Sequence, residues 1–302
     1  TILAAAARAG RKVAMVTAKE KLRDILSHEL EGIAFSAEKA DQAQESTHGI
    51  SGVEELVGEP VPEIYSAAAS LFVLKAGASL IEHGKADFLY LSLTDYMQHK
   101  FRPEDPESLD FYADIDQQLG RLIELGAVVG ATADHGMNAK QTPAGEPNVI
   151  YLESLLQQEL GEGVKVILPI TDPYVLHHGA LGSLACVHLP DSADSRAVTS
   201  RLLELDGVTE AHERQVAARK LELPADRIGD IVVLSGRDVV LGRTPEDHDL
   251  EAVKDGLRSH GGRYEEMVPF FLSEKINDEY SCRTGDLRNF DIFEFTSNGS
   301  QT

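Results

Sequence analysis

The sequence of 302 residues is about twice the length of a typical single domain, so two domains or one domain with an insertion are expected. Its 28 lysines and arginines stand against 50 aspartates and glutamates, and the net charge of −22 excludes bulk electrostatic binding to nucleic acids or anionic membranes. Two cysteines exclude a disulfide framework and indicate a reducing compartment, so the cytoplasm is the expected location. No apolar run reaches about 18 residues, which excludes a membrane-spanning helix.

The first half of the chain alternates short β-rich runs with longer helical runs, a pattern typical of a mostly parallel sheet with crossover helices. Strands are expected at 13–17, 32–35, 87–93 and 127–132, and helices through 21–26, 62–82 and 109–125. The strands at 87–93 and 127–132 are apolar on both faces, as central parallel strands are, and polar residues follow each of them. Because ligands of open α/β sheets bind at the carboxyl ends of strands, these two ends are candidate sites.

From about residue 148 the elements are shorter and indicate a smaller α+β segment. Strands are expected there at 164–168 and 183–189, and helices at 195–205 and 210–217. Strands at 231–234 and 268–272 are expected to return to the main sheet, and 291–302 to form a terminal strand or tail. The sequence therefore predicts an α/β core domain in 1–148, an inserted cap in 149–228 and a return to the core in 229–302.

Residues of metal-ligand type follow both candidate strand ends. Asp95 and His99 are four residues apart, so a helix that begins there places a carboxylate and an imidazole on one face. Asp134 and His135 are adjacent and precede Gly136, which suits a sharp turn in which both side chains reach one site. Each motif alone is a weak signal, because a helix-capping aspartate or a surface histidine explains it equally well.

A third such element is His260 in the run SHGG, just before the expected strand at 268–272. Three elements of this kind favour a common metal centre over coincidence. Zinc is the metal that binds mixed carboxylates and imidazoles, with manganese or iron as alternatives. Two metals about 3.5–4 Å apart can clamp the attacking and leaving oxygens of a phosphoryl displacement.

The runs TDYMQH, ADHGM and SHGG, the last followed after five residues by VPFF, resemble in this order the alkaline phosphatase superfamily of two-metal phosphohydrolases. The runs VTAKEKLR and HHGALGS favour the phosphonoacetate hydrolase family over its sister phosphodiesterases. The likeness extends over essentially the whole chain. It implies an alkaline-phosphatase-like fold, with a central, mostly parallel sheet, flanking helices and a smaller α+β cap.

The resemblance also implies an activity, a substrate and a ligand set. The expected reaction is hydrolysis of the carbon–phosphorus bond of phosphonoacetate, a small anionic phosphonate, to acetate and phosphate by a site with two zinc ions. By analogy Asp95, His99 and His260 hold one metal, while Asp134 and His135 hold the other together with an earlier aspartate. Only the resemblance suggests a homodimer.

The chain departs from the family at its beginning. The family carries its first metal-binding aspartate on the opening strand and a nucleophilic threonine at the start of a later helix, both well before VTAKEKLR. Only 16 residues precede Thr17, and neither Thr1 nor Thr17 fits the nucleophile's context. The resemblance therefore implies that the nucleophile lies upstream of Thr1, that the N-terminal part of the family is missing here, and that this span alone is inactive.

Four residues are candidates for contacting the substrate. Lys19 and Lys21 follow the strand at 13–17, and in so acidic a chain they suggest an anion site, which a resemblance to a carboxylate-binding lysine pair supports. The alternative is a solvated helix start, where lysine opposes the helix dipole. His177 and His178 lie in a turn of the expected cap and either cover the pocket or belong to a loop that packs on the core.

Three functions remain open from the sequence. The first is the two-zinc phosphonate hydrolase. The second keeps the fold and the metals but hydrolyses phosphodiesters or phosphomonoesters. The third is an inactive metal-binding fragment or binding module.

Overall fold

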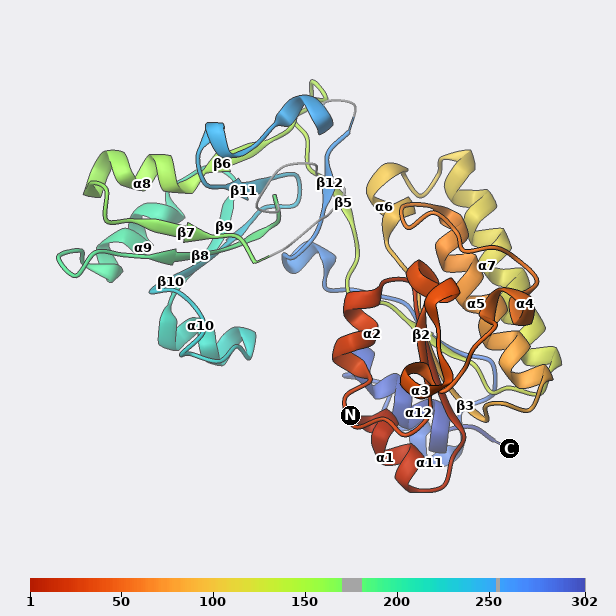
Figure 1. The fold of residues 1–302 in the computed structure, drawn as a ribbon. Coiled ribbons are helices and arrows are strands. Elements are labelled where there is room, and N and C mark those ends of the chain that lie inside the picture. The colour runs from red at the N-terminus through yellow and green to blue at the C-terminus, as the bar shows by residue number, and fades with distance from the viewer. Residues whose placement is uncertain (170–180, 254–255, 302) are drawn as a thin grey trace. The chain divides into compact units, whose positions relative to one another are not determined.

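The structure is a computed structural model that describes residues 1–169, 181–253 and 256–301. These residues form two compact units, the first made of 1–131 and 270–302 and the second of 132–269 (Figure 1). His177 and His178 lie outside the described residues.

A three-stranded parallel sheet forms the centre of the first unit, in the order β2-β1-β3 (Figure 1). The strands are β1 (Val13–Thr17), β2 (Ile33–Ser36) and β3 (Phe88–Ser92), close to their expected positions. Every residue of β1 and β2 is buried. The expectation of a fully buried central strand at 87–93 is wrong, because β3 is an edge of this sheet and its residues are only partly buried.

Helices cover both faces of this sheet. The alternate β1 residues Ala14 and Val16 pack with Phe72 and Val73 of α5 (Ala67–Glu82), whereas Val13 and Met15 pack with residues of α1 (Ile2–Arg8) and α12 (Ile292–Asn298). This alternation follows from the period of two in a strand. The remaining helices of the unit are α2 (Glu20–Leu26), η1 (Ala37–Gln42), α3 (Glu45–His48), α4 (Val53–Val57), α6 (Tyr96–Lys100), α7 (Pro106–Glu124), α11 (Asp278–Ser281) and η5 (Asn289–Asp291).

Three expectations for the first unit need correction. The helix expected at 62–82 begins at Ala67, because Ser66 supplies the N-cap by accepting a hydrogen bond from the backbone N–H of Ala69. The terminal segment is the helix α12 and not a strand or tail, since Ile292 and Phe295 are three residues apart and bury one helical face. The strand expected at 268–272 is β13 (Phe270–Leu272), which pairs with β4 (Gly130–Thr132) and not with the three-stranded sheet.

Two glycines of the first unit give a matched test of backbone stability. Gly49 and Gly58 end α3 and α4 with φ of 68° and 79°. A Cβ on Gly49 would lie 2.6 Å from the carbonyl oxygen of Gly32, whereas a Cβ on Gly58 would meet nothing within 4 Å. We expect Gly58→Ala to lower the free energy of unfolding by about 1–2 kcal/mol through backbone strain alone, and Gly49→Ala by about 3 kcal/mol or more. Urea unfolding of both variants measures this, and equal losses would contradict it.

The second unit is built on a four-stranded antiparallel sheet in the order β7-β8-β10-β9 (Figure 1). Its strands are β7 (Lys165–Ile167), β8 (Leu184–His188), β9 (Val208–Glu213) and β10 (Ile231–Ser235). Ile231 and Val233 pack toward α8 (Leu152–Leu160) and α9 (Ser195–Leu203), while Val232 packs toward α10 (Arg214–Leu221). The sheet is therefore covered by helices on both faces.

Two predictions for this region are wrong. The strand at 231–234 does not return to the main sheet, because β10 pairs with β8 on one side and β9 on the other. The helix expected at 210–217 is divided between β9 and α10, since the edge of β10 draws 208–213 into the sheet. The boundaries of the expected cap stay a prediction. The compact unit groups 132–148 and 229–269 with 149–228, because β5 (Asn138–Ala139) pairs with β12 (Arg258–Ser259) and β6 (Val149–Tyr151) pairs with β11 (Val240–Gly242).

None of the helices in the described parts of the chain combines the length and the apolar character needed to cross a membrane.

Candidate metal and substrate site

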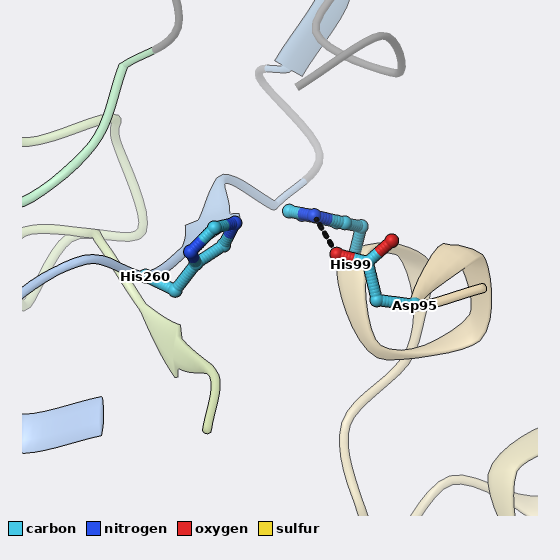
Figure 2. A group of neighbouring side chains, drawn as sticks. All are labelled: Asp95, His99 and His260. Atoms are coloured by element: carbon cyan, nitrogen blue, oxygen red, sulfur yellow. Dashed lines mark hydrogen bonds and ion pairs between the residues drawn. The ribbon is translucent and has the colours of Figure 1, made fainter. Parts of the chain in front are cut away.

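Asp95 and His99 meet at the start of a short helix that follows β3. Asp95 is the N-cap residue of α6, and the backbone N–H of His99 donates to the carbonyl oxygen of Asp95 at 3.1 Å. This one turn brings His99 Nε2 to 3.0 Å from Asp95 Oδ2, as Figure 2 shows by its dashed line. The predicted pairing of the two side chains on one helical face is therefore confirmed. His99 is buried, so the Asp95 carboxylate takes the place of water as the hydrogen-bond partner of its imidazole.

The turn before α6 is held by the neighbouring helix. The backbone N–H of Thr94 donates to Ser70 Oγ of α5 at 3.1 Å, and both residues are buried. Sequence reasoning gave Ser70 no role, because a serine inside an apolar helix carries no signal of its own. Its hydroxyl fixes where β3 stops and hence where Asp95 begins the next turn.

In the second unit His135 and His260 lie face to face. Their rings are 3.6 Å apart between centroids and nearly parallel, with an angle of 4° between the planes. His135 Nδ1 donates to the carbonyl oxygen of Gly136 at 2.9 Å, which makes Nε2 the candidate ligand nitrogen of this ring. An imidazole oriented in this way through its other nitrogen is typical of a metal ligand. Figure 2 draws His260 where it follows β12.

Asp134 places its carboxylate near the Nε2 atom of His135. Its Oδ1 accepts a hydrogen bond from the backbone N–H of His135 at 3.1 Å and lies 3.7 Å from His135 Nε2. The Asp134 side chain is 86% exposed, in contrast to the buried His99 of the first unit. A carboxylate that is open to solvent and adjacent to a lone-pair nitrogen is a suitable partial ligand set for a divalent cation.

Lys19 lies at the same sheet edge as Asp95, within the first unit. Thr17 pairs in register with Ser92, and the backbone N–H of Ala18 donates to the carbonyl oxygen of Ser92 at 2.8 Å. Lys19 and Thr94 each come two residues after this last paired step, so both chains leave the sheet at its carboxyl end. Lys19 Nζ is 5.6 Å from the centre of the Tyr65 ring, and Lys21 is exposed on the first turn of α2.

The carboxylate between the two lysines is neutralised from the other side. Burial acts to raise the pKa of Glu20, but hydrogen bonds from Arg23 and Ser36 outweigh it and hold that pKa below its ordinary value. The Ser36 hydroxyl donates to Glu20 Oε2 at 2.6 Å, and Arg23 forms an ion pair with Glu20 Oε1. The negative charge of Glu20 is thus balanced by the Arg23 ion pair and stabilised by the Ser36 hydroxyl.

Neither threonine near the beginning of the chain is placed as a nucleophile. Thr17 is fully buried, and its hydroxyl donates to the carbonyl oxygen of Lys19 at 2.8 Å. The Thr1 hydroxyl caps α1 by accepting from the backbone N–H of Ala4 at 3.1 Å. Both hydroxyls therefore have structural partners.

Comparison with known proteins places these motifs in a family. Residues 5–263 match the model of the type I phosphodiesterase / nucleotide pyrophosphatase family. The chain belongs to this family. The resemblance to phosphonoacetate hydrolase and the α/β fold class, with a mostly parallel sheet flanked by helices, are likewise confirmed.

Two crystal structures of phosphonoacetate hydrolase from Sinorhizobium meliloti 1021, in complex with phosphonoformate and with phosphonoacetate, share 45% sequence identity with this family member. Each match has a TM-score of 0.91 and covers 99% of this chain and 73% of the other. Murine ectonucleotide pyrophosphatase / phosphodiesterase 5 matches at 16% identity with a TM-score of 0.57, over 91% of this chain and 63% of its own, and supports the fold alone. Together these findings support hydrolysis of a phosphoester or a carbon–phosphorus bond as the class of activity.

Proposed function

We propose that this protein hydrolyses the carbon–phosphorus bond of phosphonoacetate to acetate and phosphate at a site with two zinc ions. The observation that carries the proposal is the 45% identity, over 99% of this chain, to an enzyme solved with phosphonoacetate itself. Water supplies a hydroxyl group to phosphorus and a proton to the departing methylene carbon, so the reaction needs no oxidant or reductant.

The donor types of the candidate site suit zinc. Asp95, His99 and His260 are a candidate ligand set for one metal, and we assign Asp134 and His135 to the other. Three imidazoles among five donors favour zinc over magnesium or calcium, which prefer oxygen ligands, whereas manganese and iron remain alternatives. The parallel stacking of His135 on His260 fits two neighbouring ions, each bound by one of the two rings.

The two zinc ions, when bound, supply the positive charge that draws electrons from the phosphoryl oxygens and lowers the pKa of a bound hydroxyl group. In this proposal the residues of the chain bind the substrate and hold the metal ions. Lys19 and Lys21 bind the carboxylate of phosphonoacetate at the carboxyl end of the sheet, and Asp95 and His99 would hold one zinc ion at the same edge. Thr17 and Thr1, with their hydroxyls engaged elsewhere, have no part in the nucleophilic step.

The test is inorganic phosphate release by the zinc-loaded product of the complete gene. Phosphonoacetate, a phosphomonoester and a phosphodiester are supplied side by side, each with and without a chelator. We expect preferential release from phosphonoacetate and loss of that release after chelation. Release from the esters alone would contradict the proposal and leave only the fold and the metals.

The second candidate function is hydrolysis of phosphodiesters or phosphomonoesters at the same site. The match of residues 5–263 to the type I phosphodiesterase / nucleotide pyrophosphatase family favours it. The run from Val16 to Arg23, which carries both lysines, favours the phosphonate instead, because a phosphoester without a carboxylate gives this pair nothing to bind. The same substrate panel separates these functions, and an inactive protein that still binds zinc would point to the metal-binding module.

A further inference from the structure

We infer that the buried ion pair between Lys140 and Glu265 positions His135 and His260 for metal binding. The inference rests on the proposed metal site and adds to it two residues that do not themselves contact the metal. All of the groups concerned lie within the second unit.

Glu265 joins the two loops that carry the histidines. Its Oε1 accepts from Asn138 Nδ2 at 2.6 Å, and its Oε2 accepts from the backbone N–H of Gly262 at 2.9 Å. Its carbonyl oxygen accepts from the backbone N–H of Gly136 at 2.7 Å. Gly136 and Asn138 follow His135 by one and three residues, and Gly262 follows His260 by two. One residue therefore holds both loops at points next to the two imidazoles.

Lys140 binds Glu265 from the protein interior and links it to the segment that contacts His260. Its Nζ donates to Glu265 Oε1 at 2.9 Å, to Ser183 Oγ at 2.8 Å and to the carbonyl oxygen of Arg237 at 2.8 Å. The backbone N–H of Ser183 in turn donates to the carbonyl oxygen of His260 at 2.9 Å. All three ammonium protons are thus used, and one of the paths leads back to His260.

The ion pair is fully enclosed, which decides how it acts. The Lys140 and Glu265 side chains are 0% and 1% exposed. Burial lowers the pKa of Lys140, and the hydrogen bond and charge of Glu265 oppose that effect. No substrate reaches groups buried so deeply, so neither the lysine nor the neighbouring Ser183 is a nucleophile. What the pair fixes is the geometry of the segments around it.

The backbone pairing of β5 with β12 is too short to fix the loops that carry His135 and His260. β5 and β12 pair at only two positions, Ala139 with Arg258 and Ser259 with Asn138. Those pairs precede His260 and follow His135, so the two histidine loops extend beyond the ladder. Beyond the ladder, Glu265 connects the two loops through its hydrogen bonds to Gly136, Asn138 and Gly262. These bonds hold the two imidazole rings 3.6 Å apart. Mutation of residues that orient metal ligands in this way typically lowers metal affinity by about 10- to 100-fold.

The experiment measures zinc affinity by competition with a chromogenic chelator, using the product of the complete gene and the variants Glu265→Gln and Asn138→Ala. Glu265→Gln removes the charge that faces Lys140. Asn138→Ala keeps the ion pair but removes the Asn138 hydrogen bonds to Glu265 and the Tyr264 carbonyl oxygen, and the one that it accepts from Arg237. We expect zinc affinity to fall about 10- to 100-fold for Glu265→Gln and less for Asn138→Ala. The matched control is Leu202→Ala, which opens a cavity in the buried core of the same unit without touching either loop.

The outcomes separate a positioning role from a merely structural one. We expect Leu202→Ala to lower the melting temperature and leave zinc affinity unchanged. Equal zinc affinity in wild type, Glu265→Gln and Asn138→Ala would overturn the inference and leave the metal site intact. If Glu265→Gln fails to fold, unchanged zinc affinity in Asn138→Ala overturns it. Absence of zinc binding in the wild type would instead overturn the proposed metal site itself, and with it this inference.

Discussion

His260→Ala and His99→Ala are each expected to lower kcat/KM for phosphonoacetate by about 1,000-fold or more, with the loss of one zinc per chain. A catalytic metal contributes several kcal/mol to the stabilisation of the transition state, and about 1.4 kcal/mol corresponds to a factor of ten. His99 is buried against Asp95, so its loss also removes the hydrogen bond between the two side chains. Phosphate release and zinc content by mass spectrometry, measured on the same samples, test both parts of the expectation.

His28 offers the matched control for these substitutions. Its imidazole is 77% exposed and its nearest acidic partner is Glu29 at 3.7 Å, so it is a surface histidine. His28→Ala is expected to keep both zinc ions and full activity. Full zinc content together with unchanged kcat/KM in His260→Ala would show that His260 is not a ligand.

His135→Ala tests the assignment of the two stacked rings to different metals. We expect this variant to lose the second zinc and keep the first, because Asp95, His99 and His260 remain. The double variant His135→Ala/His260→Ala is then expected to lose both ions. If either single variant already loses both, the stacked rings act on one shared centre and the assignment of one ring to each metal is wrong.

The local parts of this site follow from the sequence. A four-residue spacing after an apolar strand was sufficient to predict that Asp95 and His99 share a helical face, because one helical turn has only one geometry. β1 was predicted at its observed bounds for a similar reason, since a short apolar run between polar segments has few alternatives.

The parts that depend on long-range pairing do not follow from the sequence. Apolar residues at 231–234 indicate a buried strand, but they carry no information on which sheet will bury it. Lys140 and Glu265 are 125 positions apart, and nothing near either residue marks it as buried. A lysine and a glutamate usually lie on the surface, so each looks ordinary until the fold brings them together. The contact of Lys19 with the Tyr65 ring was not predicted for a different reason. Residue 65 fell inside the helix expected at 62–82, whereas the observed helix begins at Ala67.

The two lysines at the sheet edge give the second large expected effect. Lys19→Met and Lys21→Met are each expected to raise KM for phosphonoacetate about tenfold, because a charge-assisted hydrogen bond contributes about 1.5 kcal/mol or more. Their combination is expected to reach about 100-fold if the two contributions add. In a chain of net charge −22, a dianionic substrate depends on such local positive charge. KM for a phosphomonoester, which lacks the carboxylate, is expected to stay within a few-fold of wild type.

Lys12→Met is the matched control, because Lys12 precedes β1 at the amino end of the strand while Lys19 follows it at the carboxyl end. Its Nζ donates to the carbonyl oxygen of Gly84 at 3.2 Å, and its removal is expected to leave both KM values unchanged.

Protein stability separates the two interpretations of the lysine pair. Lysine near the start of α2 opposes the helix dipole, so Lys19→Met and Lys21→Met are expected to preserve or slightly raise the free energy of unfolding while KM rises. An equal rise in KM for phosphonoacetate and the phosphomonoester would mean that the lysines do not recognise the carboxylate, and unchanged KM values would mean that they only cover the start of a helix.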